Sequence, residues 1–301
     1  MIKNVTVTNK YNESLVITLN DVEPESGLFI TDISGLGPVK ASVNFASLSS
    51  QDGSKFNSAR VPERNVVLTL RHISTNAEAS RLLTYKYFPV KQKINFKVET
   101  ENRKLEIDGY VESNEQNIFS KETTSVISIL CEDPYFRSYG LDGETKVDFS
   151  NTEPLFEFPL DIPTEGIEMG AISELVEKNI IYSGDADTGL IMYIDFYDKV
   201  TNLIVYNRTS RETMSIDTEK IKTISGEYLQ QGDRIVINTI KGQKSMVLIR
   251  EGITTNIINC LGLNTNWFTL TKGDNVFTYT ADEGIYDMHF SVKYRRLYEG
   301  V

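Results

Sequence analysis

The first seventy residues alternate apolar and polar positions in short runs, as half-buried strands do. Val5 and Val7 begin the pattern, and two longer runs flank the polar stretch Ser49–Ser54, whose Asp-Gly pair is a good turn signal. At about 3.3 Å per residue, the outgoing run from Val39 to Ser50 would span about 40 Å. That length is large for a strand inside one small domain. The sequence therefore predicts a long protruding hairpin over residues 39–70.

The stem of this hairpin carries four apolar residues, namely Val43, Phe45, Leu48 and Phe56. An unpaired arm with exposed apolar side chains promotes aggregation unless a partner covers it. We therefore predict that these residues form a contact between subunits. The alternative is that Phe45 and Phe56 pack in the core of their own domain.

One helix is predicted near residues 75–88. Thr75 followed by Glu78 has the spacing of a capping box, and Pro89 ends the segment. The apolar positions between them follow helical spacing and predict the buried stripe: Ala79, Leu82, Leu83 and Tyr87. Together with further strand patterns at 94–98, 105–107 and 125–131, they indicate a β-rich first domain with one helix.

The distribution of proline divides the chain. All eight prolines lie in the first 163 residues, and a turn-rich stretch covers residues 133–143. We place the boundary near residue 140, which gives domains 1–140 and 141–301. The second domain shows short strands with turn signals about every ten residues, the pattern of a β-sandwich. Its strand candidates are 180–182, 190–197, 203–206, 221–225, 234–238, 244–250, 267–270, 275–280 and 285–294.

Charge and composition narrow the function classes. A net charge of −11 argues against tight binding of DNA or RNA, which depends on basic patches. Cys131 and Cys260 are expected to be buried thiols, and with only His72 and His289 beside them they predict no metal site. No apolar run has the length of a signal peptide or a membrane span, so we expect synthesis in a cytoplasm and no membrane contact. No phosphate-binding or dinucleotide motif occurs, and no cofactor is predicted.

Two acidic patterns have an enzymatic or metal-binding interpretation. Glu106, Asp108 and Glu112 share one face of a predicted strand, as the carboxylates of some glycosidases do. A solvent-facing side of that strand explains the same alternation. The stretch Gly184–Gly189 resembles a fragment of a calcium loop but lacks its distal glutamate, and it is interpreted as a hairpin turn. We predict no catalytic residues.

Several motifs occur in a fixed order along nearly the whole chain. They are residues 64–68, 87–89, 109–112, 117–122 and 131–136 in the first half, and 232–239, 242–245, Trp267 with Leu270, 273–275 and 298–301 in the second. Taken together, they resemble the distal tail protein family of tailed phages and prophages of Gram-positive bacteria. The resemblance implies a ring-forming N-terminal domain, a C-terminal galectin-like β-sandwich and a non-enzymatic structural role.

The same resemblance implies a place in the virion. Six copies would form a ring at the tail tip, joining the tail tube protein to a tail-associated tip protein, with a receptor-binding protein as a further candidate partner. DNA would pass through the lumen without being bound, which a ring charge of 6 × −11 = −66 favours. Assembly would take place in the host cytoplasm. The main alternative is a carbohydrate-binding host-adhesion module, which requires two or more exposed aromatic residues in a groove.

Overall fold

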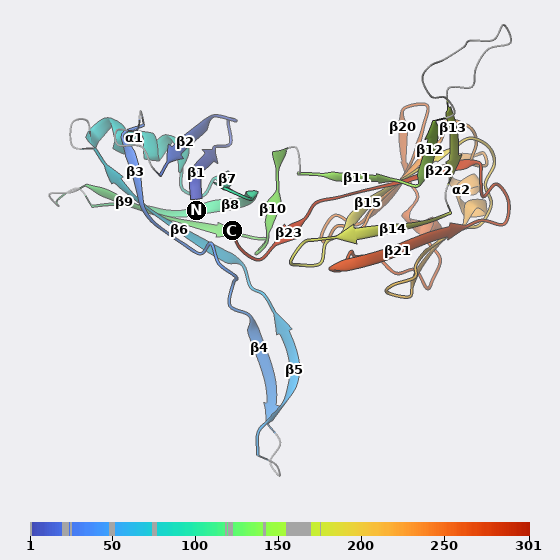
Figure 1. The fold of residues 1–301 in the computed structure, drawn as a ribbon, viewed down its shortest axis with the longest axis horizontal. Helices are drawn as coiled ribbons and strands as arrows, with labels where there is room; N and C mark the ends of the chain where they lie inside the picture. Colours follow the sequence, from blue (N-terminus) through green and yellow to red (C-terminus); the bar gives the residue numbers. More distant parts are fainter. Residues whose placement is uncertain are drawn as a thin grey trace, which may run out of the picture. The chain divides into compact units, whose positions relative to one another are not determined.

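The protein consists of two compact units. The computed structural model describes residues 2–19, 24, 26–47, 52–73, 77–117, 119, 123–140, 143–154, 170–174 and 176–301. Unit 1 comprises Met1–Gly143 together with Leu297–Val301, and unit 2 comprises Glu144–Arg296 (Figure 1). Each unit has its own buried apolar core. Unit 2 is therefore an insertion in unit 1, whereas the sequence assigned residues 297–301 to the second domain.

Unit 1 is built on one antiparallel sheet in the order β2-β1-β7-β8-β9-β6-β3, with β10 paired to β8 and to β23. Alternate residues of each strand point into the core, as Val66, Leu68 and Leu70 do on one strand. The strands of unit 1 are β1 (Ile2–Thr8), β2 (Ser14–Thr18), β3 (Leu28–Ser34), β4 (Ser42–Ser47), β5 (Ser54–Arg60), β6 (Arg64–His72), β7 (Lys93–Thr100), β8 (Lys104–Asn117), β9 (Thr124–Cys131), β10 (Phe136–Ser138) and β23 (Leu297–Tyr298).

Strands β4 and β5 form a separate two-stranded ribbon, and in the described residues they pair only with each other (Figure 1). We call this ribbon, residues 42–60, the arm. It is shorter than the predicted hairpin of residues 39–70, because β6 pairs with β9 and β3 in the main sheet. Pro62 separates β5 from β6; it lacks a backbone N–H and restricts the residue before it, so the strand cannot continue through it. Gly53, with φ +92°, lies in the turn as the Asp-Gly signal indicated.

Helix α1 (Ala77–Tyr87) lies where the sequence predicted it, but only part of the predicted apolar stripe faces the core. Thr75 of the proposed capping box lies outside the described residues. The residues that α1 buries are Ser80 and Thr84, whereas Leu82 is 55% exposed. The predicted apolar stripe is therefore wrong at Leu82 and at the exposed Ala79, whereas Leu83 and Tyr87 pack against the core of unit 1. The cause is tertiary, because the sheet presents polar side chains to the helix at this point.

Unit 2 is a β-sandwich of two antiparallel sheets, ordered β11-β22-β15-β18-β19-β20 and β14-β21-β16-β17, around one core. The predictions of a mainly β fold and of a second-half sandwich are confirmed. Its strands are β11 (Thr145–Asp148), β12 (Ser150–Pro154), β13 (Gly170–Glu174), β14 (Glu177–Tyr182), β15 (Leu190–Phe196), β16 (Leu203–Asn207), β17 (Glu212–Ile216), β18 (Arg234–Asn238), β19 (Ser245–Arg250), β20 (Ile253–Asn256), β21 (Gly273–Thr280) and β22 (Met288–Tyr294). Strands β12 and β13 pair with each other, and a short 3-10 helix, η3, covers Ile258–Cys260.

Residues 221–225, predicted as a strand, belong instead to helix α2 (Thr218–Ser225). The Asp217 carboxylate caps the helix by accepting a hydrogen bond from the Lys220 backbone N–H, and Gly226 ends it with φ +86°. Asp217 and Gly226 were the residues in the sequence that could have indicated a helix here. Residues 267–270 are not a strand either, because only Leu270 forms an isolated bridge, with Thr188.

The acidic stretch Gly184–Gly189 is not a hairpin turn. It connects β14, which pairs with β21, to β15, which pairs with β18 and β22 in the other sheet. The segment therefore crosses from one layer of the sandwich to the other. The Tyr182 hydroxyl donates to the Ala186 carbonyl at 2.7 Å and holds this crossing in place.

Candidate interaction surface: the arm of unit 1

The arm has one apolar and one polar face. Val43 pairs with Ala59 and Phe45 pairs with Phe56, which leaves Asn57 as an extra residue on β5. This bulge matters because 56 and 59 are three residues apart and would otherwise point to opposite sides of the ribbon. With the bulge, all four apolar side chains share one face.

The opposite face of the arm carries the polar pairs. Ser42 lies opposite Arg60, and Asn44 lies opposite Ser58, with the Asn44 Nδ2 donating to the Ser58 Oγ at 3.3 Å. Every residue of β4 and β5 is exposed in the single chain. The arm therefore presents a polar face that suits water and an apolar face that does not.

The predicted contact residues lie on the apolar face. Val43, Phe45 and Phe56 are 44%, 60% and 58% exposed, and none of them belongs to the core of unit 1. The two phenylalanine rings are edge to face with centroids 6.3 Å apart, so they contact each other rather than the body of the unit. The fourth residue, Leu48, lies outside the described residues. This apolar face and the two unpaired strand edges are features that a partner chain can cover.

Sequence reasoning missed the residue that holds the base of the arm. Arg64, the first residue of β6, is only 1% exposed, and its guanidinium donates four hydrogen bonds of 2.5–2.7 Å to backbone carbonyls. The acceptors are the carbonyls of Gly35, Gly37, Pro134 and Glu299. No periodicity marks such a residue, because its role depends on segments far apart in the chain.

A second exposed apolar area lies between the end of α1 and the turn that joins β1 to β2. Tyr11, Tyr85 and Val90 line an open hollow there and are 70%, 44% and 47% exposed. The Lys86 Nζ and the Glu13 carboxylate form an ion pair of 2.8 Å beside it. The sequence did not indicate this surface, since its residues come from separate elements.

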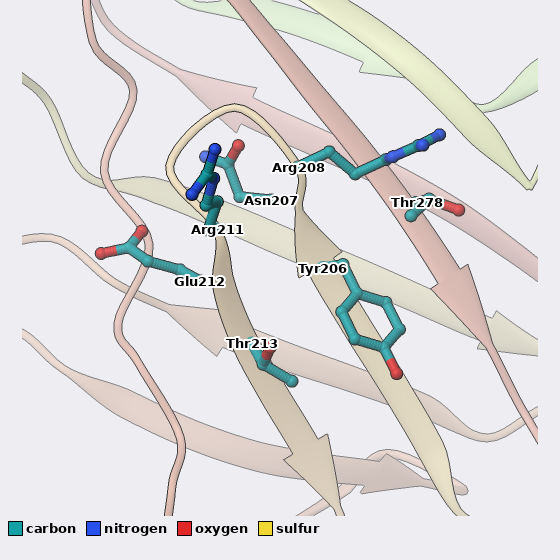
Figure 2. A pocket seen from close by; sticks show the side chains of 7 residues that line it. All are labelled: Tyr206, Asn207, Arg208, Arg211, Glu212, Thr213 and Thr278. Carbon is teal, nitrogen blue, oxygen red and sulfur yellow. The ribbon is translucent and has the colours of Figure 1, made fainter.

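Unit 2 has an open hollow at the turn between β16 and β17, shown in Figure 2. Its lining consists of Tyr206, Asn207, Arg208, Arg211, Glu212, Thr213 and Thr278. Arg208 forms an ion pair of 2.5 Å with Glu177, and the Asn207 Oδ1 accepts hydrogen bonds from the turn. One aromatic side chain, Tyr206, lines this hollow, whereas the carbohydrate-binding alternative requires two or more in a groove.

The acidic face of β8 is half-buried or exposed, opposite the buried positions of the same strand. The Asp108 carboxylate accepts hydrogen bonds from Asn95 at 2.9 Å and from Arg137 at 2.8 Å. Burial opposes its ionisation, but these bonds and the nearby Lys93 outweigh that effect and hold the pKa of Asp108 below its usual range. A carboxylate kept ionised in this way is unsuited to act as a general acid.

Both thiols are free and fully buried, Cys131 in unit 1 and Cys260 in unit 2. Burial raises the pKa of Cys131 to about 12 and also raises that of Cys260. Among the described residues, no three His, Cys, Asp or Glu side chains gather into a group that could hold a metal ion. In the same part of the chain, no helix is long and apolar enough to cross a membrane.

Most of unit 2 is similar to a known protein family. Residues 183–298 match the family described as the siphovirus-type tail component, C-terminal domain. The matched residues span most of unit 2. The resemblance to phage tail proteins that the ordered motifs indicated is thereby confirmed. No curated protein matches the chain.

Among solved structures, one has a similar fold over nearly the whole chain. The crystal structure of SPP1 Dit (gp 19.1), a hub adsorption apparatus protein of phages that infect Gram-positive hosts, has a TM-score of 0.65 at 10% identity and covers 97% of this chain and 98% of that one. The phage P2 baseplate structures with calcium and with strontium give TM-scores of 0.44 at 11% and 10% identity; they cover 97% of this chain, and 98% and 97% of theirs. The first of these likenesses shows a shared fold.

Proposed function

We propose that this protein is a non-enzymatic structural subunit of a phage tail tip, which assembles into a ring of six copies. The match of residues 183–298 to a siphovirus-type tail component is the observation that carries this proposal. In the ring, unit 1 forms the contacts between copies, and unit 2 is a galectin-like sandwich. The ring joins the tail tube protein to tail-tip proteins, and the virion is its final location.

The arm supplies the contact between neighbouring copies. Its apolar face, with Val43, Phe45 and Phe56, needs a partner, and a neighbouring copy provides one in a head-to-tail arrangement. Such heterologous contacts close into rings when the rotation between copies is a whole fraction of a turn. Leu48, next to the tip, is assigned to the same contact.

The mass in solution tests the proposal first. A ring of six has a mass of 6 × 34.1 kDa, or about 205 kDa, and sedimentation separates it clearly from a monomer. A monomer at concentrations well above micromolar, together with binding to cell-wall polysaccharide by unit 2, would favour the carbohydrate-binding alternative. A glycan array with unit 2 supplies that second measurement.

Replacing both Phe45 and Phe56 by Ser tests the arm. Because each ring is more than half exposed in the single chain, the double variant should keep the melting temperature of the subunit. The ring should dissociate, since aromatic residues at the centre of an interface contribute about 2 kcal/mol or more each. Val126→Ser also replaces an exposed apolar side chain by serine, at a 39% exposed site on β9. It is the control and should keep the ring. An intact ring in the double variant, or an unfolded subunit, contradicts the assignment.

A further inference from the structure

The chain leaves unit 1 and returns to it at one place. Strand β10 leads toward unit 2, and β23 comes back from it. These two strands pair side by side, with Phe136 opposite Tyr298 and Arg137 opposite Leu297. The outgoing and returning strands therefore form one small antiparallel pair within unit 1.

The base of the arm contacts the same place. The Val301 backbone N–H donates to the Leu36 carbonyl at 3.1 Å. A Cβ atom on Gly300 would lie 3.1 Å from that carbonyl oxygen, so the backbone of residues 300–301 is pressed against the segment that leads into β4. Gly35, with φ +82°, lies even closer to β6, since a Cβ there would be 2.0 Å from the Asn65 carbonyl oxygen.

One side chain connects all three segments. The Arg64 Nη1 donates to Gly35 and Gly37 at the arm base, its Nε donates to Pro134 before β10, and its Nη2 donates to Glu299 after β23. We propose that Arg64 is a positioning residue for the arm, whose guanidinium holds the arm base to the two strands that connect with unit 2.

Arginine is the residue that this geometry requires. Its planar fork carries five donors that point outward in different directions, and four of them are used here. The buried charge has no carboxylate partner within ion-pair distance in the described part of the chain; carbonyl dipoles and the Phe136 ring, centred 4.5 Å away, surround it instead. A lysine ammonium carries its three donors on a single nitrogen, so it cannot reach all four of these carbonyls at once.

The arrangement makes the order of the arm depend on residues 297–301. If β23 moves, the Glu299 carbonyl leaves Arg64, and the same guanidinium then holds Gly35 and Gly37 less firmly. This coupling is a property of a single chain. Its consequence for ring assembly rests on the proposed function, because only that function gives the arm a neighbour to contact.

Limited trypsin cleavage and amide hydrogen exchange on the dilute full-length chain test the coupling. In Arg64→Lys, cleavage after the exposed Lys40 at the arm base should be about tenfold to about a hundredfold faster, the range that one hydrogen bond to a charged group provides, and so should exchange of the Val301 amide that donates to Leu36. Amides of β7 and β8 should keep their wild-type rates. Arg71→Lys, an exposed arginine on the same strand that lies 5.3 Å from the Phe29 ring, is the matched control and should change neither segment.

A double-mutant cycle with Gly300→Val separates coupling from general loosening. The valine side chain displaces residues 300–301 from Leu36 and should by itself speed trypsin cleavage after Lys40. Combined with Arg64→Lys, its effect should be much smaller than the sum of the two single effects. Additive effects, or a wild-type rate of cleavage after Lys40 in a folded Arg64→Lys chain, would overturn the proposal.

These experiments distinguish failure of the Arg64 proposal from failure of the proposed ring. If Arg64→Lys does not fold, Gly300→Val alone decides, and an unchanged rate of cleavage after Lys40 contradicts the proposal. If the wild-type chain proves monomeric, the proposed ring fails while the cleavage and exchange results still judge the role of Arg64. Where the ring does form, Arg64→Lys should weaken it although no residue of β4 or β5 has changed.

Discussion

At the scale of single residues, Asp108 shows how an acidic pattern acquires a structural role. Its side chain is 31% exposed and ion-paired to Arg137 at 2.8 Å and Lys93 at 3.3 Å. Because its folded-state pKa is held below the usual value, the carboxylate stabilises the fold above the ordinary Asp pKa. That contribution disappears as the pH falls through the lowered value.

We therefore expect Asp108→Asn to reduce the free energy of unfolding by about 1 kcal/mol at pH 7, a value that allows for partial solvent exposure. At a pH well below the ordinary Asp pKa, by contrast, the variant and the wild type should converge, because the wild-type carboxyl is then protonated. Urea denaturation at the two pH values measures this. A difference that stays constant with pH would show that the ion pairs contribute nothing.

The buried thiols are expected to be inert. A Cys131 pKa of about 12 leaves almost no thiolate at neutral pH, and the thiolate is the reactive form. Iodoacetamide should label neither cysteine in the native chain at pH 8 and both after unfolding in urea. Replacing both by Ala should lower the free energy of unfolding by about 1 kcal/mol per site and leave assembly intact. Rapid native labelling, followed by loss of assembly, would contradict this.

At the scale of elements, α1 is held by hydrogen bonds as well as by the packing of Leu83 and Tyr87 against the core. Thr84 is fully buried, and its hydroxyl accepts a hydrogen bond from the Gln116 side chain at 3.2 Å. The Asn114 amide donates to the Thr84 and Phe88 carbonyls. The Thr84 hydroxyl accepts one of the two hydrogen bonds that the Gln116 Nε2 donates, and an apolar side chain would remove that acceptor.

This arrangement predicts a large loss of stability at one helix position and a small change at a nearby one. Thr84→Val should lower the free energy of unfolding by about 1–3 kcal/mol, because it removes the acceptor for Gln116 without changing the side-chain volume. Leu82→Ser should change it by less than about 0.5 kcal/mol, since Leu82 is 55% exposed. Thermal melts of both variants decide. A larger loss of unfolding free energy in Leu82→Ser than in Thr84→Val would contradict this prediction.

At the scale of the whole molecule, unit 2 is inserted in unit 1, and its core draws on residues of its own only. We expect residues 144–296 to fold alone with cooperative unfolding. A fragment of residues 141–301 should fold as well, but with rapid amide exchange at residues 297–301, which lie with unit 1 in the intact chain. Calorimetry and exchange on both fragments check this, and a fragment 144–296 without a cooperative transition would refute it.

Local patterning was sufficient for much of this protein. Two-residue alternation at Val66–Leu70 specifies a strand with one buried face, and the Asp-Gly pair specifies a turn, because both depend on near neighbours in the chain. The exposed phenylalanines of the arm could be named from the length of the runs that carry them. The ordered motifs also pointed to the family of phage tail proteins.

Only the tertiary structure decided the rest. The polar face of α1, the sheet crossing at Gly184–Gly189 and the return of residues 297–301 to unit 1 all depend on what lies opposite a segment in space. Arg64 is the clearest case, since its acceptors come from segments up to 235 residues away in the sequence. The buried charge of Arg64 depends on carbonyl acceptors from distant segments, and no local pattern in the sequence encodes their convergence.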